Sequence, residues 1–307
     1  MLDQTASRGQ LWKLLGDLPD RNRPISVEHL TTGERDGYVV EHLRLDLNGI
    51  EPVPAYFTHP KQRKGRLPTV LYHHASGPYD MGKEELLSGR PALVDPPYAQ
   101  VLAALGIQAL AIDSWGWGER RGRPESALAK AMLWQGRTLW GMMVFDSIRA
   151  LDYLVERDDV DITRLATLGL SMGSTMAWWI AALDPRIWLT VDLCCLTDFE
   201  TLLEDNGLDG HGLYYYVPGL LKHFSTTEIN SLIAPRPHLS LNGIYDPLTP
   251  LRGLRKIDQG LRAVYQAQGR EEAWKLILSE TGHFETRAMR VEIIRWLQKW
   301  LVLPSDG

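Results

Sequence analysis

The feature that most constrains the fold is a regular alternation of short apolar runs with longer helical stretches, which begins at Leu67 and continues toward the C-terminus. Uninterrupted apolar runs are typical of strands buried on both faces, and parallel strands need crossover helices between them. The alternation therefore predicts an α/β fold, with a doubly wound, mostly parallel central sheet flanked by helices. The expected parallel strands are 69–73, 107–112, 165–168, 189–193, 238–241 and 275–278, and the expected helices are 96–105, 136–155, 172–183, 252–268 and 287–301.

Three β-rich runs precede this pattern, at 25–30, 38–46 and 53–58, with polar or Gly/Pro-containing turns between them. We expect them to form antiparallel leading strands, which gives a sheet of about eight strands. Residues 10–18 carry apolar side chains at helical spacing and predict a short helix within an N-terminal extension, 1–23. Because large α/β folds often reach this size as one unit, we predict a single domain over residues 1–307.

One connection, 197–232, interrupts the alternation just before the expected strand 238–241. It contains turns rich in Asn, Asp and Gly, three consecutive tyrosines from Tyr214 to Tyr216, and a short apolar helix around Leu220. Long inserts in compact domains are often functional. We therefore expect a cap-like helical insert, and whether it moves as a lid stays open.

Charge and composition argue against several classes of partner. The formal net charge is −5 and there is no block rich in Lys or Arg, so nothing favours nucleic acid or an anionic membrane as partner. The first twenty residues lack the features of a secretory signal and no segment approaches the length of a bilayer span, which predicts a cytoplasmic protein. Cys194 and Cys195 are adjacent, so we expect neither a disulfide nor a structural zinc site, and no bound metal.

The sharpest motif is Gly169-Leu170-Ser171-Met172-Gly173, which lies between the apolar run 165–168 and the helix expected from Met172. A G-x-S-x-G sequence in this strand–turn–helix context is typical of a nucleophile elbow. The turn strains the serine backbone, and the glycines leave room where chain segments approach closely. Because the helix N-terminus points at the serine, the N–H of Met172 is predicted to be one donor of an oxyanion hole.

Two later residues complete a nucleophile, acid and base series. Asp246 follows the expected strand 238–241 in a turn, and His283 follows the last expected strand. In this arrangement neutral His283 takes the proton of Ser171, Asp246 holds the histidine tautomer, and an acyl-enzyme forms. The alternatives are a turn aspartate that caps local amides and an ordinary surface histidine, with Asp258 as a weaker candidate for the acid.

A second oxyanion donor is expected in the loop 73–77, which follows the expected strand 69–73. The N–H of Ala75 is our choice, although the sequence does not reveal which amide points inward. His74 in the same loop is a candidate substrate contact. Adjacent side chains of an extended segment point to opposite faces, so His73 and His74 do not form a metal pair, and one of them can simply anchor the loop.

Aromatic residues at the same edge of the sheet are candidates for the substrate pocket. Trp115 and Trp117 follow the expected strand 107–112, and His211 and Tyr215 belong to the insert. The two tryptophans can equally cover the sheet edge, with Asp113 and Arg120 paired to hold their loop. The aromatic cluster of the insert can equally be ordinary core.

Several stretches together resemble the α/β-hydrolase superfamily, near its dienelactone hydrolase and acetyl xylan esterase-like branch. They are 169–173, Asp246-Pro247, Gly282-His283, the run 233–237, and the segment 160–164 ahead of the elbow. The similarity spans roughly 24–302 and implies this fold, a serine mechanism and no cofactor. Dienelactone hydrolases carry cysteine at the elbow where this chain has Ser171, which disfavours lactone hydrolysis, and related peptidases usually add a propeller domain.

The expected activity is that of a carboxylesterase acting on small-molecule esters, with acetyl or other short acyl groups as the safest class. An amidase or peptidase with the same three residues is the alternative enzyme, because ester and amide hydrolysis share a tetrahedral intermediate. A hydrolase-like binding protein without turnover is the alternative outside enzymes. The expected partner is a small-molecule ester, and the expected assembly is a monomer or a small homo-oligomer.

Overall fold

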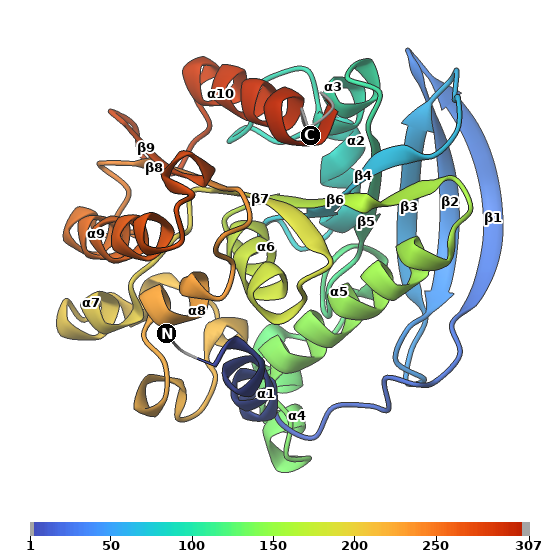
Figure 1. Ribbon diagram of the computed structural model, residues 1–307. Coiled ribbons are helices and arrows are strands. Elements are labelled where there is room, and N and C mark those ends of the chain that lie inside the picture. The colour runs from blue at the N-terminus through green and yellow to red at the C-terminus, as the bar shows by residue number, and fades with distance from the viewer. Residues whose placement is uncertain (1–2, 303–307) are drawn as a thin grey trace.

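The computed structural model describes residues 3–302, which form layers of helices around one nine-stranded sheet (Figure 1). The strand order is β1-β2-β3-β5-β4-β6-β7-β8-β9. Strands β1 to β3 are antiparallel, β3 pairs with β5 antiparallel, and all pairs from β5 onward are parallel. The bounds are β1 Ser26–Arg35, β2 Tyr38–Asp46, β3 Val53–Pro60, β4 Leu67–His73, β5 Gln108–Ile112, β6 Val160–Leu170, β7 Ile187–Leu193, β8 His238–Gly243 and β9 Trp274–Ser279.

Helices cover both faces of this sheet. The apolar runs require this, because successive side chains of a strand point to opposite faces and both sets must be shielded from water. On β4, Leu71 packs into one buried cluster while Val70 and Tyr72 pack into the other. The first cluster lies under α1, α4, α5, α6 and α9, and the second lies under α2, α3 and α10 (Figure 1). The helix bounds are α1 Gln4–Leu14, α2 Glu85–Ser88, α3 Tyr98–Ala104, α4 Glu125–Trp134, α5 Leu139–Glu156, α6 Met172–Leu183, α7 Phe199–Glu204, α8 Thr226–Ser231, α9 Leu251–Ala267 and α10 Arg287–Leu297.

The predicted doubly wound α/β fold with antiparallel leading strands is confirmed, although the sheet has nine strands where about eight were expected. The N-terminal helix starts earlier than predicted, because the side chain of Asp3 accepts hydrogen bonds from the N–H groups of Thr5 and Ala6. It also ends earlier, ahead of Gly16, whose φ of 98° is incompatible with a right-handed helix. None of the helices described is both long enough and apolar enough to cross a membrane.

The insert contains less regular helix than the predicted helical insert. Helices α7 and α8 lie at its two ends, and three short 3₁₀ turns connect them. The predicted apolar helix around Leu220 is one of these turns, Leu220–Lys222, and it starts after Gly219 in the left-handed conformation. The ring of Tyr215, in another of these turns, is buried and lies edge-on to Trp140 of α5, so the insert packs onto the body of the protein.

Candidate active site

The strand-to-helix turn at Ser171 has the strained backbone of a nucleophile elbow. Ser171 stands between β6 and α6 with φ 58° and ψ −120°, which is rare for a residue with a side chain. Its N–H donates to the carbonyl oxygen of Leu193 at the end of β7, at 2.9 Å. Such a conformation costs about 1–3 kcal/mol and persists only where the surroundings enforce it.

The glycines on either side of the serine are required by close backbone contacts. A Cβ atom on Gly169 would lie 2.4 Å from the backbone of Gly173, and one on Gly173 would lie 2.0 Å from the carbonyl oxygen of His73. No side chain fits at those distances. The elbow is therefore pressed directly against the end of β4, where a second set of backbone amides begins.

Asp246 and His283 are joined by a hydrogen bond. The Nδ1 atom of His283 lies 2.6 Å from Oδ2 of Asp246, and because a carboxylate only accepts, Nδ1–H donates. Oδ1 of Asp246 accepts from the N–H of Leu248 at 2.9 Å. The Asp246 side chain is fully buried, whereas 25% of the His283 side chain is exposed. This tautomer leaves Nε2 of His283 free to accept a proton.

The parallel sheet brings the serine, the acid and the histidine to one edge. Ser171 follows β6, Asp246 follows β8 and His283 follows β9, and the strands from β6 to β9 are consecutive neighbours with the same direction. The loop after β8 is bound to the loop after β9, because the N–H of Tyr245 donates to the carbonyl oxygen of Thr281 at 3.0 Å. The weaker acid candidate, Asp258, instead accepts from Trp274 and Arg262 on another part of the molecule.

The two predicted oxyanion donors differ in their availability. Met172 is the first residue of α6, and an amide at this position has no acceptor within its own helix. It stays a predicted donor. The choice of Ala75 is wrong, because its N–H donates to the buried carboxylate of Glu85, with 3.1 Å to Oε2.

His74 anchors a loop, and its predicted contact with substrate is wrong. Its Nε2 accepts from the N–H of Ser114 at 3.1 Å, and its Nδ1–H donates to the carbonyl oxygen of Ala75 at 2.9 Å. Only 2% of the residue is exposed, and burial lowers the pKa of its imidazole. The ring therefore stays neutral and holds the loops after β4 and β5 together.

Both tryptophans after β5 are core residues, so the prediction that they line the pocket is wrong. Trp115 is 2% exposed and lies under the guanidinium of Arg120, 4.3 Å from the ring centre. Trp117 is completely buried and donates its indole N–H to the carbonyl oxygen of Ser76. The alternative, that these rings cover the edge of the sheet, describes them correctly.

The expected ion pair between Asp113 and Arg120 is replaced by other contacts. The carboxylate of Asp113 binds Nζ of Lys83 at 2.9 Å, and the guanidinium of Arg120 binds the carboxylate of Asp146 at 2.8 Å. Arg120 also donates to the carbonyl oxygen of Asp113. The loop is thus held as expected, but by different partners.

His211 and Tyr215 lie on the insert close to the acid and the histidine. Their rings stack with centres 4.3 Å apart and planes 11° apart. Burial lowers the pKa of His211, and its electrostatic partners include His283 and Asp246. The Tyr215 hydroxyl lies 3.8 Å from Sγ of Cys195, just after β7. Both stay candidate substrate contacts.

An open cleft of about 640 Å³ adjoins His211. Its other polar walls are Tyr79, Arg121, Arg123, Glu125 and Ser126. Tyr79 is half exposed, with its ring stacked on buried Trp117 at 5.3 Å. Among residues 3–302, no group of three His, Cys, Asp or Glu side chains is arranged to hold a metal ion.

Two supporting groups could not be found from sequence motifs. Glu85 is buried and binds Ala75, the Tyr72 hydroxyl and Arg90, so it fixes the loop after β4. Its only sequence signal is a glutamate near an expected loop. The carbonyl oxygen of Leu248 is the other group, and a backbone atom leaves no signal in side-chain patterns.

A mostly parallel sheet with a strained serine after β6 and a His–Asp pair after the last two strands defines an α/β-hydrolase, which confirms the predicted superfamily. No family model matches the chain. It is 54% identical over 295 residues to the protein named "Putative hydrolase YtaP" of Bacillus subtilis (strain 168), and the match covers 96% of this chain and 98% of that protein. The chain belongs to this hydrolase family.

Solved structures share the fold at low sequence identity. A "putative acetyl xylan esterase" of Bacteroides fragilis NCTC 9343 superposes with a TM-score of 0.73 at 18% identity, over 99% of this chain and 83% of that one. A protein named "Methylesterase BT1017" gives a TM-score of 0.75 at 18% identity, over 97% of this chain and 63% of that one. At such identities the likeness establishes the architecture alone.

Proposed function

We propose that the protein hydrolyses carboxylic esters of small molecules, with Ser171 as nucleophile, His283 as general base and Asp246 as the acid that orients it. The observation that carries the proposal is the 2.6 Å hydrogen bond between His283 and Asp246 at the sheet edge where the strained Ser171 also lies. Membership of the YtaP hydrolase family and the esterase names of the structural neighbours support it.

In the proposed reaction, Nε2 of His283 takes the hydroxyl proton while Oγ of Ser171 attacks the ester carbonyl carbon. Negative charge then develops on the former carbonyl oxygen, where the N–H of Met172 and the N-terminus of α6 stabilise it. His283 returns the proton to the leaving alcohol oxygen, and an acyl-enzyme remains. Water, activated by the same histidine, hydrolyses this ester and regenerates Ser171.

Acetyl and other short acyl groups are the proposed acyl class. Tyr214 and Tyr215 of the insert are 4% and 6% exposed, and they pack against the loops after β5 and β7. This close cover over the sheet edge favours a small acyl group. The polar cleft beside His211 suits a hydrophilic alcohol portion, because its walls carry a phenol, a carboxylate and guanidinium groups.

A fluorophosphonate probe tests the nucleophile directly, since it modifies an activated serine regardless of the natural substrate. We expect the mapped adduct on the peptide that contains Ser171, and no adduct in the Ser171→Ala variant. Equal labelling of wild type and variant would overturn the assignment. Parallel assays with p-nitrophenyl acetate and an acetanilide test which bond is cleaved. Faster turnover of the anilide would show that the enzyme is an amidase and not an esterase.

A further inference from the structure

The carbonyl oxygen of Leu248 receives two hydrogen bonds from the insert. Nε2–H of His211 and the hydroxyl of Thr197 each donate to it at 3.1 Å. Leu248 also donates its own N–H to Oδ1 of Asp246. Leu248 therefore links the two regions. Its carbonyl oxygen is bound by the insert, and its N–H binds the proposed catalytic acid, Asp246.

The ring of His211 is fixed by its own surroundings. It stacks on Tyr215, and Tyr215 in turn meets Phe199 of α7 edge-on, with ring centres 5.3 Å apart. The insert backbone also touches the acid loop, because a Cβ atom on Gly210 would lie 2.9 Å from Cδ2 of Leu248. The contact between insert and acid loop thus includes packing as well as hydrogen bonds.

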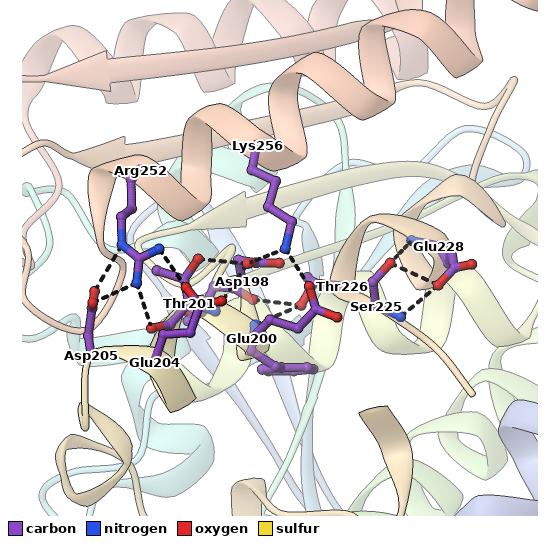
Figure 2. Close-up of polar contacts among 12 residues, drawn as sticks. Asp198, Glu200, Thr201, Glu204, Asp205, Ser225, Thr226, Glu228, Arg252 and Lys256 are labelled. Atoms are coloured by element: carbon purple, nitrogen blue, oxygen red, sulfur yellow. Dashed lines mark hydrogen bonds and ion pairs between the residues drawn. The ribbon is translucent and has the colours of Figure 1, made fainter. Parts of the chain in front are cut away.

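Ion pairs fasten the base of the insert to α9, the helix that begins directly after the acid loop (Figure 2). Lys256 binds the buried carboxylate of Asp198 at 3.0 Å and the exposed carboxylate of Glu200 at 2.5 Å. Arg252 binds Glu204 and Asp205 at the end of α7. The insert is therefore joined both to Leu248 within the acid loop, residues 244–250, and to α9, which follows this loop.

We propose that the insert 197–232 positions the catalytic acid, with His211 as a positioning residue that acts through Leu248 and Asp246. The proposal rests on the proposed function. Without the His211 bond, Leu248 is held less firmly and the Asp246 carboxylate can turn away from Nδ1 of His283. The imidazole then loses the partner that fixes its tautomer, which slows the chemical step with little effect on binding.

Two substitutions at position 211 separate the hydrogen bond from the ring stacking. His211→Phe keeps an aromatic ring on Tyr215 and removes the donor, whereas His211→Gln keeps an N–H at the position of Nε2 and removes the ring. We expect His211→Phe to lower kcat about tenfold with KM nearly unchanged, and His211→Gln to recover most of that loss. His223→Phe is the matched control, because His223 lies on the same insert but contacts Gln10.

A double-mutant cycle with Asp246→Asn identifies the route of the effect. If His211 acts through the acid, His211→Phe has no further effect on kcat once Asp246 is changed. A full tenfold loss in both backgrounds would overturn the positioning role. Should His211→Phe fail to fold, Thr197→Val removes the second donor with little change in shape and enters the same cycle.

The rate of fluorophosphonate labelling separates this proposal from the proposed function. No labelling of Ser171 in the wild type would overturn the proposed function. Labelling of Ser171 at equal rates in the wild type and in His211→Phe would overturn the positioning role alone. We expect the labelling rate to fall in parallel with kcat.

Discussion

Two histidine–aspartate pairs in this protein have the same hydrogen-bond length and very different surroundings. His283 and Asp246 are 2.6 Å apart in the loops after β9 and β8, and a quarter of the histidine side chain is exposed. His238 and Asp192 are also 2.6 Å apart, but they lie within β8 and β7 and neither side chain is exposed.

The interior pair is enclosed by further contacts. Oδ1 of Asp192 accepts from the Ser240 hydroxyl at 2.7 Å, and the ring of Trp274 packs against that of His238 with centres 4.9 Å apart. No substrate can reach such an imidazole. A hydrogen bond to aspartate is therefore not enough to make a histidine a general base. The histidine must also lie at the end of a strand, where one ring nitrogen can reach a substrate.

The same substitution in the two acids gives the sharpest test of this difference. Asp246→Asn is expected to lower kcat by about 10⁴-fold, because the amide no longer favours the required tautomer of His283 or its charged form. Thermal unfolding should change little. Steady-state kinetics on an ester, with the melting temperature measured alongside, checks both parts, and near-normal turnover would remove Asp246 from the mechanism.

Asp192→Asn is expected to have the opposite result. Changing one partner of a buried pair leaves its polar neighbours poorly matched, so the free energy of unfolding should fall by about 3 kcal/mol. The kcat of the folded enzyme should stay within about threefold of the wild type. Urea unfolding and kinetics at low temperature measure the two quantities. A collapse of kcat in a well-folded variant would contradict the separation of the two pairs.

Local spacing and strand order were enough to predict the strained turn at Ser171 and the placement of Asp246 and His283 at the same edge of the sheet, while their catalytic roles stay a prediction. Gly169 and Gly173 follow from the close approach that a tight strand-to-helix turn imposes. Asp246 and His283 follow because parallel strands deliver their C-terminal ends to one edge. These features depend on backbone geometry, which a sequence pattern encodes directly.

The errors concern groups whose hydrogen-bond partners and burial are set by tertiary packing. The Ala75 amide looked free because nothing nearby in sequence shows that Glu85 turns its carboxylate toward it. The ring nitrogens of His74 bind backbone atoms, one of them on Ser114 after another strand. Backbone partners leave no signal in the sequence, so His74 looked available for substrate. Trp117 lies at the correct edge, but Tyr79 and Tyr214 cover it. Amide direction and side-chain burial are set by tertiary packing.

Ser240→Ala tests how far the interior pair depends on its surroundings. The change removes the 2.7 Å hydrogen bond to Asp192 and also leaves the side-chain amide of Asn242 without its acceptor on Ser240. We expect the free energy of unfolding to fall by about 1–2 kcal/mol, less than for Asp192→Asn, with kcat unchanged. Urea unfolding gives the comparison, and a loss as large as that of Asp192→Asn would mean that the serine matters as much as the pair.

Arg252→Met gives the smallest expected effect and extends the comparison to an exposed pair. The Arg252 side chain is 52% exposed and its partner Glu204 is 63% exposed, so water screens their attraction. Lys256 still binds the buried Asp198, and the insert therefore stays attached to α9. We expect no measurable change in the urea midpoint or in kcat, at low or high salt. A salt-dependent loss of kcat in this variant would show that the exposed ion pairs, and not the partly buried contacts around Leu248, keep the insert in position over the acid.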